Sequence, residues 1–291
     1  MILTNRLNLP SSIVNAVRND PYSKGDAHIS VTGLIGPARK RAIEIAHAAE
    51  LTEDVAERIW ALMGQIAHGI LERADDEALT EERLFLERHG WRISGQFDRL
   101  LLENGLLQDY KITSTYSIKE GAKPEWVSQL NIYALMLRKH GYRIERGQAV
   151  VILRDWQKSK ARHTPEYPQT PAVVIDIPLW PTEDVETFIT ARLTEHGHAQ
   201  HKLPLCTAEE RWARPATYAL WKDGNQKATR LFATAEDAKD ALAAAQAKNL
   251  KALYRVEIMP ERSVRCADYC LAYQFCEQGK ALTMDSLGLR K

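Results

Sequence analysis

Residues 91–113 read WRISGQFDRLLLENGLLQDYKIT, and this stretch decides how the rest of the chain folds. Two apolar runs of strand length flank the Asn-Gly step at 104–105, and such a step between such runs is a strong hairpin signal. We therefore expect two antiparallel strands, with Asp98 on the first strand and with Asp109 and Lys111 on the second.

Side chains alternate along a strand with a period of two, so Asp109 and Lys111 should point to the same face. Two carboxylates can hold a hard divalent cation, and a nearby ammonium group can orient a water molecule or stabilise a negatively charged oxygen. That combination suits phosphodiester hydrolysis. The hairpin alone also fits a simpler interpretation, in which Asp98 and Lys111 are solvated residues on its open face.

The composition is that of an ordinary soluble globular protein. The chain has 291 residues, 45% hydrophobic and 26% charged, with a net charge of +1. No apolar run reaches the ~20 residues of a membrane span, and the N-terminal sequence lacks the features of a signal peptide, so we expect a cytoplasmic protein. With so little net charge, any binding of nucleic acid must depend on local patches and bound metal.

The segment GQIAHGILE, upstream of the hairpin, predicts a helix on which Gly64, His68 and Glu72 share one face, because they are spaced by four. Gly64 would allow another element to approach closely. A lone histidine on a helix is usually a packing residue, but the position of His68 just before the acidic hairpin makes it a candidate metal ligand.

Downstream of the hairpin, EWVSQLNIYALMLRKHG predicts an amphipathic helix on which Gln129 and Tyr133 face the same way. By themselves these two residues could be ordinary helix surface and core. Two β-branched strands follow, QAVVILRDW and PAVVIDIPLW, separated by the basic segment 158–163, the best local candidate for a patch that faces phosphate. This order of elements predicts an α/β fold with a mixed central sheet flanked by helices.

We expect four regions along the chain. Residues 1–29 form a loosely structured N-terminal arm, 30–205 the core, 206–259 a small inserted ββαβ lobe, and 260–291 a cysteine-rich tail.

The chain has four cysteines, Cys206, Cys266, Cys270 and Cys276, and the last three lie in RCADYCLAYQFCE. In a cytoplasmic protein this clustering favours metal ligation over disulfides. The alternative is that Cys206 is a small buried hydrophobic residue and that the spacing of the others is coincidental.

The ordered segments GQIAHGILE, SGQFD, QDYK and QLNIY resemble the PD-(D/E)XK nuclease superfamily, and most closely its RecB-type branch. That branch includes phage exonucleases and the four-cysteine CRISPR-associated exonucleases. Its pattern is a helix with GxxxH, an aspartate after the first hairpin strand, Asp/Glu-x-Lys on the next strand and QxxxY on a later helix. The resemblance covers about residues 30–160 and implies a restriction-endonuclease-like core.

The resemblance also implies a metal site. His68, Asp98 and Asp109 would ligate Mg²⁺ or Mn²⁺, with the backbone carbonyl of Tyr110 as a further ligand. Glu72 is a candidate for a supporting contact that the motif does not require.

The remaining motif residues are implied to act on the phosphate and the DNA. Lys111 would orient the attacking water or stabilise charge on the phosphate, while Gln129 and Tyr133 would position the lysine or the DNA backbone.

In iron-sulfur members of the branch, one cysteine precedes the core near a Cys-Pro-Arg step and three follow it. Here Cys266, Cys270 and Cys276 form CxxxCxxxxxC, one residue wider in the first gap, and residues 36–39 read Gly-Pro-Ala-Arg without a cysteine. Cys206 could supply the fourth thiolate of a 4Fe-4S cluster. A four-cysteine Zn²⁺ site is the alternative.

These features predict a metal-dependent DNA exonuclease of phage or prophage type, which acts in DNA recombination, repair or processing and has recombination or replication proteins as candidate partners. One alternative is a structure-specific or restriction-like endonuclease with a structural zinc site. Another is a catalytically silent nucleic-acid-binding factor, although the intact Asp98, Asp109 and Lys111 argue against it. The sequence leaves strand polarity and oligomeric state open.

Overall fold

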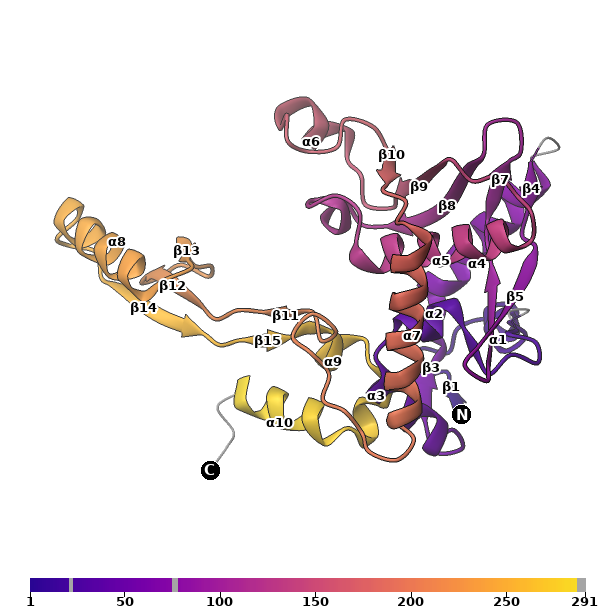
Figure 1. The fold of residues 1–291 in the computed structure, drawn as a ribbon. Helices are drawn as coiled ribbons and strands as arrows, with labels where there is room; N and C mark the ends of the chain where they lie inside the picture. Colours follow the sequence, from indigo (N-terminus) through magenta and orange to yellow (C-terminus); the bar gives the residue numbers. More distant parts are fainter. Residues whose placement is uncertain (21–22, 75–77, 287–291) are drawn as a thin grey trace. The chain divides into compact units, whose positions relative to one another are not determined.

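The computed structural model describes residues 1–20, 23–74 and 78–286, and the chain forms two compact units, Met1–Pro204 and Leu205–Lys291 (Figure 1). Across these described ranges, we find no helix with the length and apolar character that crossing a bilayer requires.

The first unit contains the predicted core elements. Its helices are α1 (Ser11–Arg18), α2 (Val31–Ile35), α3 (Ala38–Ala46), α4 (Ile59–Arg73), α5 (Pro124–Lys139), α6 (Lys158–His163) and α7 (Thr182–His198). Its strands are β1 (Ile2–Thr4), β2 (Ile29–Ser30), β3 (Thr52–Asp54), β4 (Leu79–Thr80), β5 (Arg83–Arg88), β6 (Trp91–Gln96), β7 (Arg99–Leu101), β8 (Leu106–Thr113), β9 (Arg146–Leu153) and β10 (Ala172–Ile177).

The central sheet has five strands in the order β10-β9-β8-β7-β4. Strands β8 and β9 are parallel, and α5 makes the crossover that such a pair requires. The other neighbours in this sheet are antiparallel. The predicted α/β fold with a mixed sheet and flanking helices is therefore confirmed.

Helix α5 forms the centre of the hydrophobic core, because residues 130–137 along it are all buried. It lies very close to β6 at Gly95. A Cβ atom added to Gly95 would lie 2.8 Å from the ring of Tyr133 and 3.0 Å from the sulfur of Met136. Only glycine therefore fits at this point between the helix and the strand.

The predicted hairpin forms, but its first strand is much shorter than expected. Strands β7 and β8 pair around a turn in which Gly105 has a φ of 60°. Strand β6 instead pairs with β5 and β2 in a separate three-stranded sheet. Asp98 therefore lies in the break between β6 and β7, and not on a strand. The side chain of Phe97 is fully buried at this break, so the apolar pattern continues across it and hides the change of sheet.

The N-terminal residues are more ordered than predicted, since β1 pairs in parallel with β3. The carboxylate of Asp54 accepts hydrogen bonds from the Thr4 hydroxyl at 2.7 Å and from the Arg6 backbone N–H at 2.9 Å. These bonds lower the pKa of Asp54 to about 2. The contacts are polar and span about fifty positions in sequence, so apolar periodicity could not reveal them.

The second unit contains β11 (Ala213–Arg214), β12 (Thr217–Lys222), β13 (Arg230–Phe232), α8 (Ala235–Lys248), β14 (Tyr254–Met259), β15 (Arg262–Ser263), α9 (Val264–Asp268) and α10 (Glu277–Ser286). Strands β13, β12 and β14 form one antiparallel sheet, so the element order ββαβ occurs where the sequence predicted it. The predicted tail extends to residue 291, and its last five residues lie outside the described part of the chain.

The buried His196 gives the first unit a pH-dependent stability. Its ring Nε2–H donates to the Leu34 backbone oxygen at 3.0 Å, and burial lowers the pKa of His196 to about 4. Between about pH 6.5 and pH 4 the unfolded chain takes up a proton that the folded chain does not, so stability falls as pH falls. We expect His196→Gln to lose about 1 kcal/mol less than wild type per pH unit in this window. Urea unfolding at pH 7 and pH 5 measures this difference, and parallel losses in both proteins would refute it.

Candidate active site

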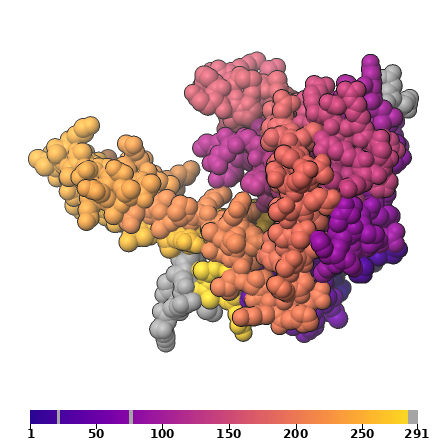
Figure 2. All heavy atoms as spheres, in the orientation of Figure 1, coloured from indigo at the N-terminus to yellow at the C-terminus, as the bar shows by residue number. Residues whose placement is uncertain are grey.

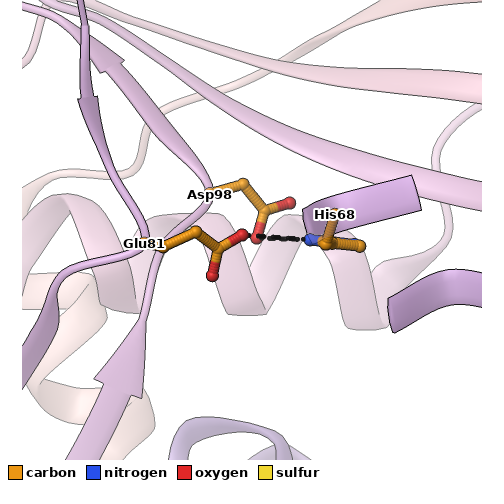
Figure 3. Close-up of side chains that lie close together, drawn as sticks. All are labelled: His68, Glu81 and Asp98. Atoms are coloured by element: carbon orange, nitrogen blue, oxygen red, sulfur yellow. Dashed lines mark hydrogen bonds and ion pairs between the residues drawn. The ribbon is translucent and has the colours of Figure 1, made fainter. Parts of the chain in front are cut away.

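Three side chains from different elements of the first unit meet at one point (Figure 3). His68 is on α4, Glu81 lies between β4 and β5, and Asp98 lies between β6 and β7. The Nδ1 atom of His68 is 3.2 Å from Glu81 Oε1 and 3.4 Å from Asp98 Oδ1. One ligand atom from each of the three residues lies within 4.8 Å of the others, a separation that one metal ion can bridge.

The backbone around Asp98 fixes this arrangement. The other carboxylate oxygen of Asp98 accepts the Tyr110 backbone N–H from β8 at 2.5 Å. The Glu81 backbone N–H donates to the Asp98 backbone oxygen at 3.3 Å, and the Gln96 amide donates to Glu81 Oε2 at 2.8 Å. Glu81 has a φ of 51°, which is uncommon for a residue other than glycine and is consistent with a functional constraint.

A second chain of contacts starts on β8 and ends on α5. Asp109 and Lys111 share a face of the strand as predicted, with Lys111 Nζ 2.6 Å from Asp109 Oδ2. Lys111 Nζ also donates to Gln129 Oε1 at 2.9 Å, and Gln129 Nε2 donates to the Tyr133 hydroxyl at 3.0 Å. The amide of Gln129 and the carboxylate of Asp109 therefore hold the ammonium group of Lys111 from two sides.

The group of His68, Glu81 and Asp98 lies close enough to Asp109 for the charge of Asp109 to act on both His68 and Asp98. Burial, and then the negative charge of Asp109, raise the pKa of Asp98 well above its usual range. The hydrogen bond to Glu81 raises the pKa of His68, and the charges of Asp98 and Asp109 act in the same direction. Asp98 and Asp109 are only 7% and 4% exposed, so their negative charges are poorly solvated.

The side chains of His68, Glu81 and Asp98 fit a divalent cation. Carboxylate oxygens suit Mg²⁺ and Mn²⁺, and an imidazole nitrogen is compatible with several divalent metals. Two buried carboxylates that repel one another are also stabilised when a cation lies between them.

The structure adds one residue to the predicted set. Glu81 contacts His68, whereas the sequence pattern had pointed to Glu72, which is exposed. Glu81 lies outside the recognised motifs, and its only signal in the sequence is an acidic pair, Glu81-Glu82, just before an apolar strand. Tyr110 lies beside the site, with its ring 6.2 Å from the ring of His68 in an edge arrangement.

The second unit brings the cysteines together. Cys276 is buried, and Cys206, Cys266 and Cys270 are partly exposed. Burial, followed by the charges of Glu210, Cys276, Cys266 and Cys270, raises the pKa of Cys206 to about 12. Cys206 therefore lies in the same small region as three cysteines that follow it by sixty or more residues.

Side chains and backbone around the cysteines hold this region in place. The Cys206 backbone N–H donates to Gln278 Oε1 at 2.8 Å, and Gln278 Nε2 donates to the Cys206 backbone oxygen at 2.9 Å. The Gly279 N–H donates to the sulfur of Cys276 at 3.4 Å. Backbone N–H groups directed at cysteine sulfur are common around metal-thiolate centres, so these residues fit a bound metal or cluster.

Comparison with known proteins assigns the family. The profile of the PD-(D/E)XK nuclease superfamily matches residues 37–277, which is more than half of the chain. The chain belongs to the PD-(D/E)XK nuclease superfamily. Membership implies a nuclease that uses divalent metal ions, and the residues of this nuclease that fit such an ion lie inside the matched region.

No curated protein matches the nuclease in sequence. Among solved structures, it is similar to the one titled "Crystal structure of SSO0001", with 19% identity, a TM-score of 0.47, and coverage of 69% of this chain and 87% of that chain.

Proposed function

We propose that the protein is a metal-dependent DNA exonuclease of phage or prophage type that hydrolyses phosphodiester bonds in DNA recombination, repair or processing. The observation that carries the proposal is the convergence of His68, Glu81 and Asp98 beside the Asp109–Lys111 pair. A metal ion held by such a cluster can activate water for phosphodiester hydrolysis, and a positioned ammonium group can stabilise negative charge on the phosphate.

His68, Asp98 and Asp109 would hold Mg²⁺ or Mn²⁺, with the Tyr110 carbonyl as a further ligand and Glu81 either as a ligand or as the residue that orients the His68 ring. A metal ion bound there would lower the pKa of a water molecule and offset the charge that develops on the phosphate.

Lys111 would orient the attacking water or stabilise the developing negative charge. Asp109 and Gln129 fix the position of its ammonium group, and Tyr133 fixes Gln129 in turn. The rotamer of Lys111 is thus set before substrate binds.

The exonuclease mode predicts a requirement for DNA ends. The nuclease should degrade linear duplex or single-stranded DNA progressively in the presence of Mg²⁺ and leave covalently closed circular DNA intact. Gel analysis of both substrates over time measures this. Equal cleavage of the closed circle would reject the exonuclease mode and favour an endonuclease on the same site.

We further propose that Cys206, Cys266, Cys270 and Cys276 hold a 4Fe-4S cluster, for which four thiolates are the usual ligand set. Structural zinc sites more often pair their cysteines in two CxxC-like segments, whereas Cys266, Cys270 and Cys276 form CxxxCxxxxxC. The sequence spacing therefore favours an iron-sulfur cluster over Zn²⁺.

The cluster predicts a visible signal. Protein purified without oxygen should be brown with a broad absorbance, and changing any one of the four cysteines to alanine should diminish that absorbance. A colourless protein with one equivalent of zinc would identify the metal as zinc. An unchanged spectrum in Cys206→Ala would remove Cys206 from the ligand set.

A further inference from the structure

Helix α4 has an open track that runs from Trp60 to the proposed metal ligand His68. Trp60, Gly64 and His68 are spaced by four and so lie on one side of the helix. Trp60 is 55% exposed, and the side chain of His68 at the other end reaches the metal-binding group. Eight residues of helix place these two positions about 12 Å apart.

Gly64 lies in the middle of the track and has no side chain to cover the helix there. A Cβ atom added to Gly64 would have no atom of another described element within 4 Å. The expectation that another element of the chain packs closely on this glycine is therefore wrong. A glycine inside a helix costs about 0.5–1 kcal/mol relative to alanine, and close approach of a ligand is one physical use for such a position.

The positively charged side chain of Arg154 contacts Trp60 at one end of the track. The guanidinium of Arg154 lies over the Trp60 ring, 3.9 Å from its centroid. Arg154 follows the end of β9, and its backbone N–H donates to the Thr113 oxygen at 2.9 Å, two residues beyond Lys111 on β8. Trp60 and Arg154 therefore lie beyond the end of the strand that carries Lys111.

The segment that Arg154 begins is strongly basic. Residues 154–163 contain four Lys or Arg residues and one carboxylate, Asp155, whose oxygens accept hydrogen bonds from Thr115. Within this segment, α6 is the projecting rose-coloured element near the top of Figures 1 and 2. Its charge complements a polyphosphate backbone.

We propose that this track binds one unpaired strand of DNA, with a base stacked on the paired side chains of Trp60 and Arg154, phosphates at the basic segment, and the strand crossing Gly64 toward His68. An exposed indole beside cations is the usual platform for single strands, because stacking on it requires an unpaired base. The 12 Å between its ends corresponds to about three or four stacked nucleotides at 3.4 Å each. The inference rests on the proposed nuclease function, and it specifies a substrate with a single-stranded end.

Binding and cleavage are measured separately to test this proposal. The probe is a fluorescent oligothymidine of about ten nucleotides, and anisotropy is recorded with Ca²⁺ in place of Mg²⁺ so that the strand is bound without turnover. Trp60→Ala and Gly64→Leu should each weaken binding about tenfold. The effect of Trp60→Ala should vanish on an abasic strand of the same length, which offers phosphates but no base to stack.

Two matched variants on α4 are the controls. Ile66→Ala removes an apolar side chain of similar exposure, 54%, and Gly69→Leu adds a side chain at another glycine whose Cβ would meet no described neighbour within 4 Å. Both positions lie on other sides of the helix, so both variants should bind the probe like wild type. Circular dichroism and melting curves should show all four variants folded, with Gly64→Leu no less stable than wild type.

Wild-type affinity in Trp60→Ala and Gly64→Leu would overturn the track, even if the wild-type protein cleaves DNA. A change of oligomeric state in Trp60→Ala without a change in DNA affinity would also overturn it, because the surface would then be a contact between copies of the chain. Weakened binding in a protein that cleaves no DNA would support the track and reject the proposed nuclease function.

Discussion

Lys111→Ala is expected to abolish DNA cleavage, lowering the rate at least about 10²–10³-fold, while binding of DNA and metal is largely retained. The ammonium group acts mainly on the charge of the transition state, so its removal should lower kcat far more than it changes KM. Initial rates on end-labelled linear DNA, compared with affinity for the same DNA in Ca²⁺, separate these two quantities.

The variant also removes the ion pair of a buried carboxylate, Asp109. Melting curves with and without Mg²⁺ are therefore needed to show that it is folded. Lys111→Met, which keeps much of the side-chain stem, should be equally inactive. Lys139→Ala removes a half-exposed lysine from α5 and should cleave at the wild-type rate. Wild-type cleavage by either Lys111 variant would reject the assigned role.

Asp98→Asn should lose both metal binding and activity. The amide keeps the shape of the side chain and an oxygen for the Tyr110 N–H, but it removes one of the negative charges that attract the cation. We expect affinity for Mn²⁺ to fall at least about tenfold and cleavage to fall further. Isothermal titration with Mn²⁺, together with rates at saturating metal, measures both effects.

Matched variants of Glu81 and Glu72 test whether Glu81 belongs to the metal site. Glu81→Gln should weaken Mn²⁺ binding about 10–100-fold, because Glu81 is either a ligand or the partner that orients His68. Glu72→Gln changes an exposed acid on the same helix as His68 and should leave binding unchanged. Equal affinities in the two variants would exclude Glu81 from the metal site.

Local periodicity was enough to place part of the site. Asp109 and Lys111 are two residues apart on one strand, and Gln129 and Tyr133 are four apart on one helix, so the sequence alone places each pair on a common face. Their observed contacts, at 2.6 Å between Asp109 and Lys111 and 3.0 Å between Gln129 and Tyr133, follow from these spacings.

Contacts between distant segments could not be predicted in this way. Glu81 reaches His68 because the backbone turns at a positive φ, and Asp98 lies where the chain passes from one sheet to another. Neither feature produces a periodic pattern of apolar and polar residues in the sequence. The pairing of β1 with β3 depends in the same way on polar contacts with Asp54, about fifty residues away.

Metal-dependent hydrolysis of end-labelled linear DNA tests the central claim most directly. Purified wild-type protein should release labelled nucleotides or short fragments in Mg²⁺ or Mn²⁺, and should release none in excess chelator or when Asp98→Asn replaces wild type. Full cleavage in excess chelator, or undiminished cleavage by Asp98→Asn, would contradict the assignment of a metal-dependent nuclease site to His68, Glu81, Asp98, Asp109 and Lys111.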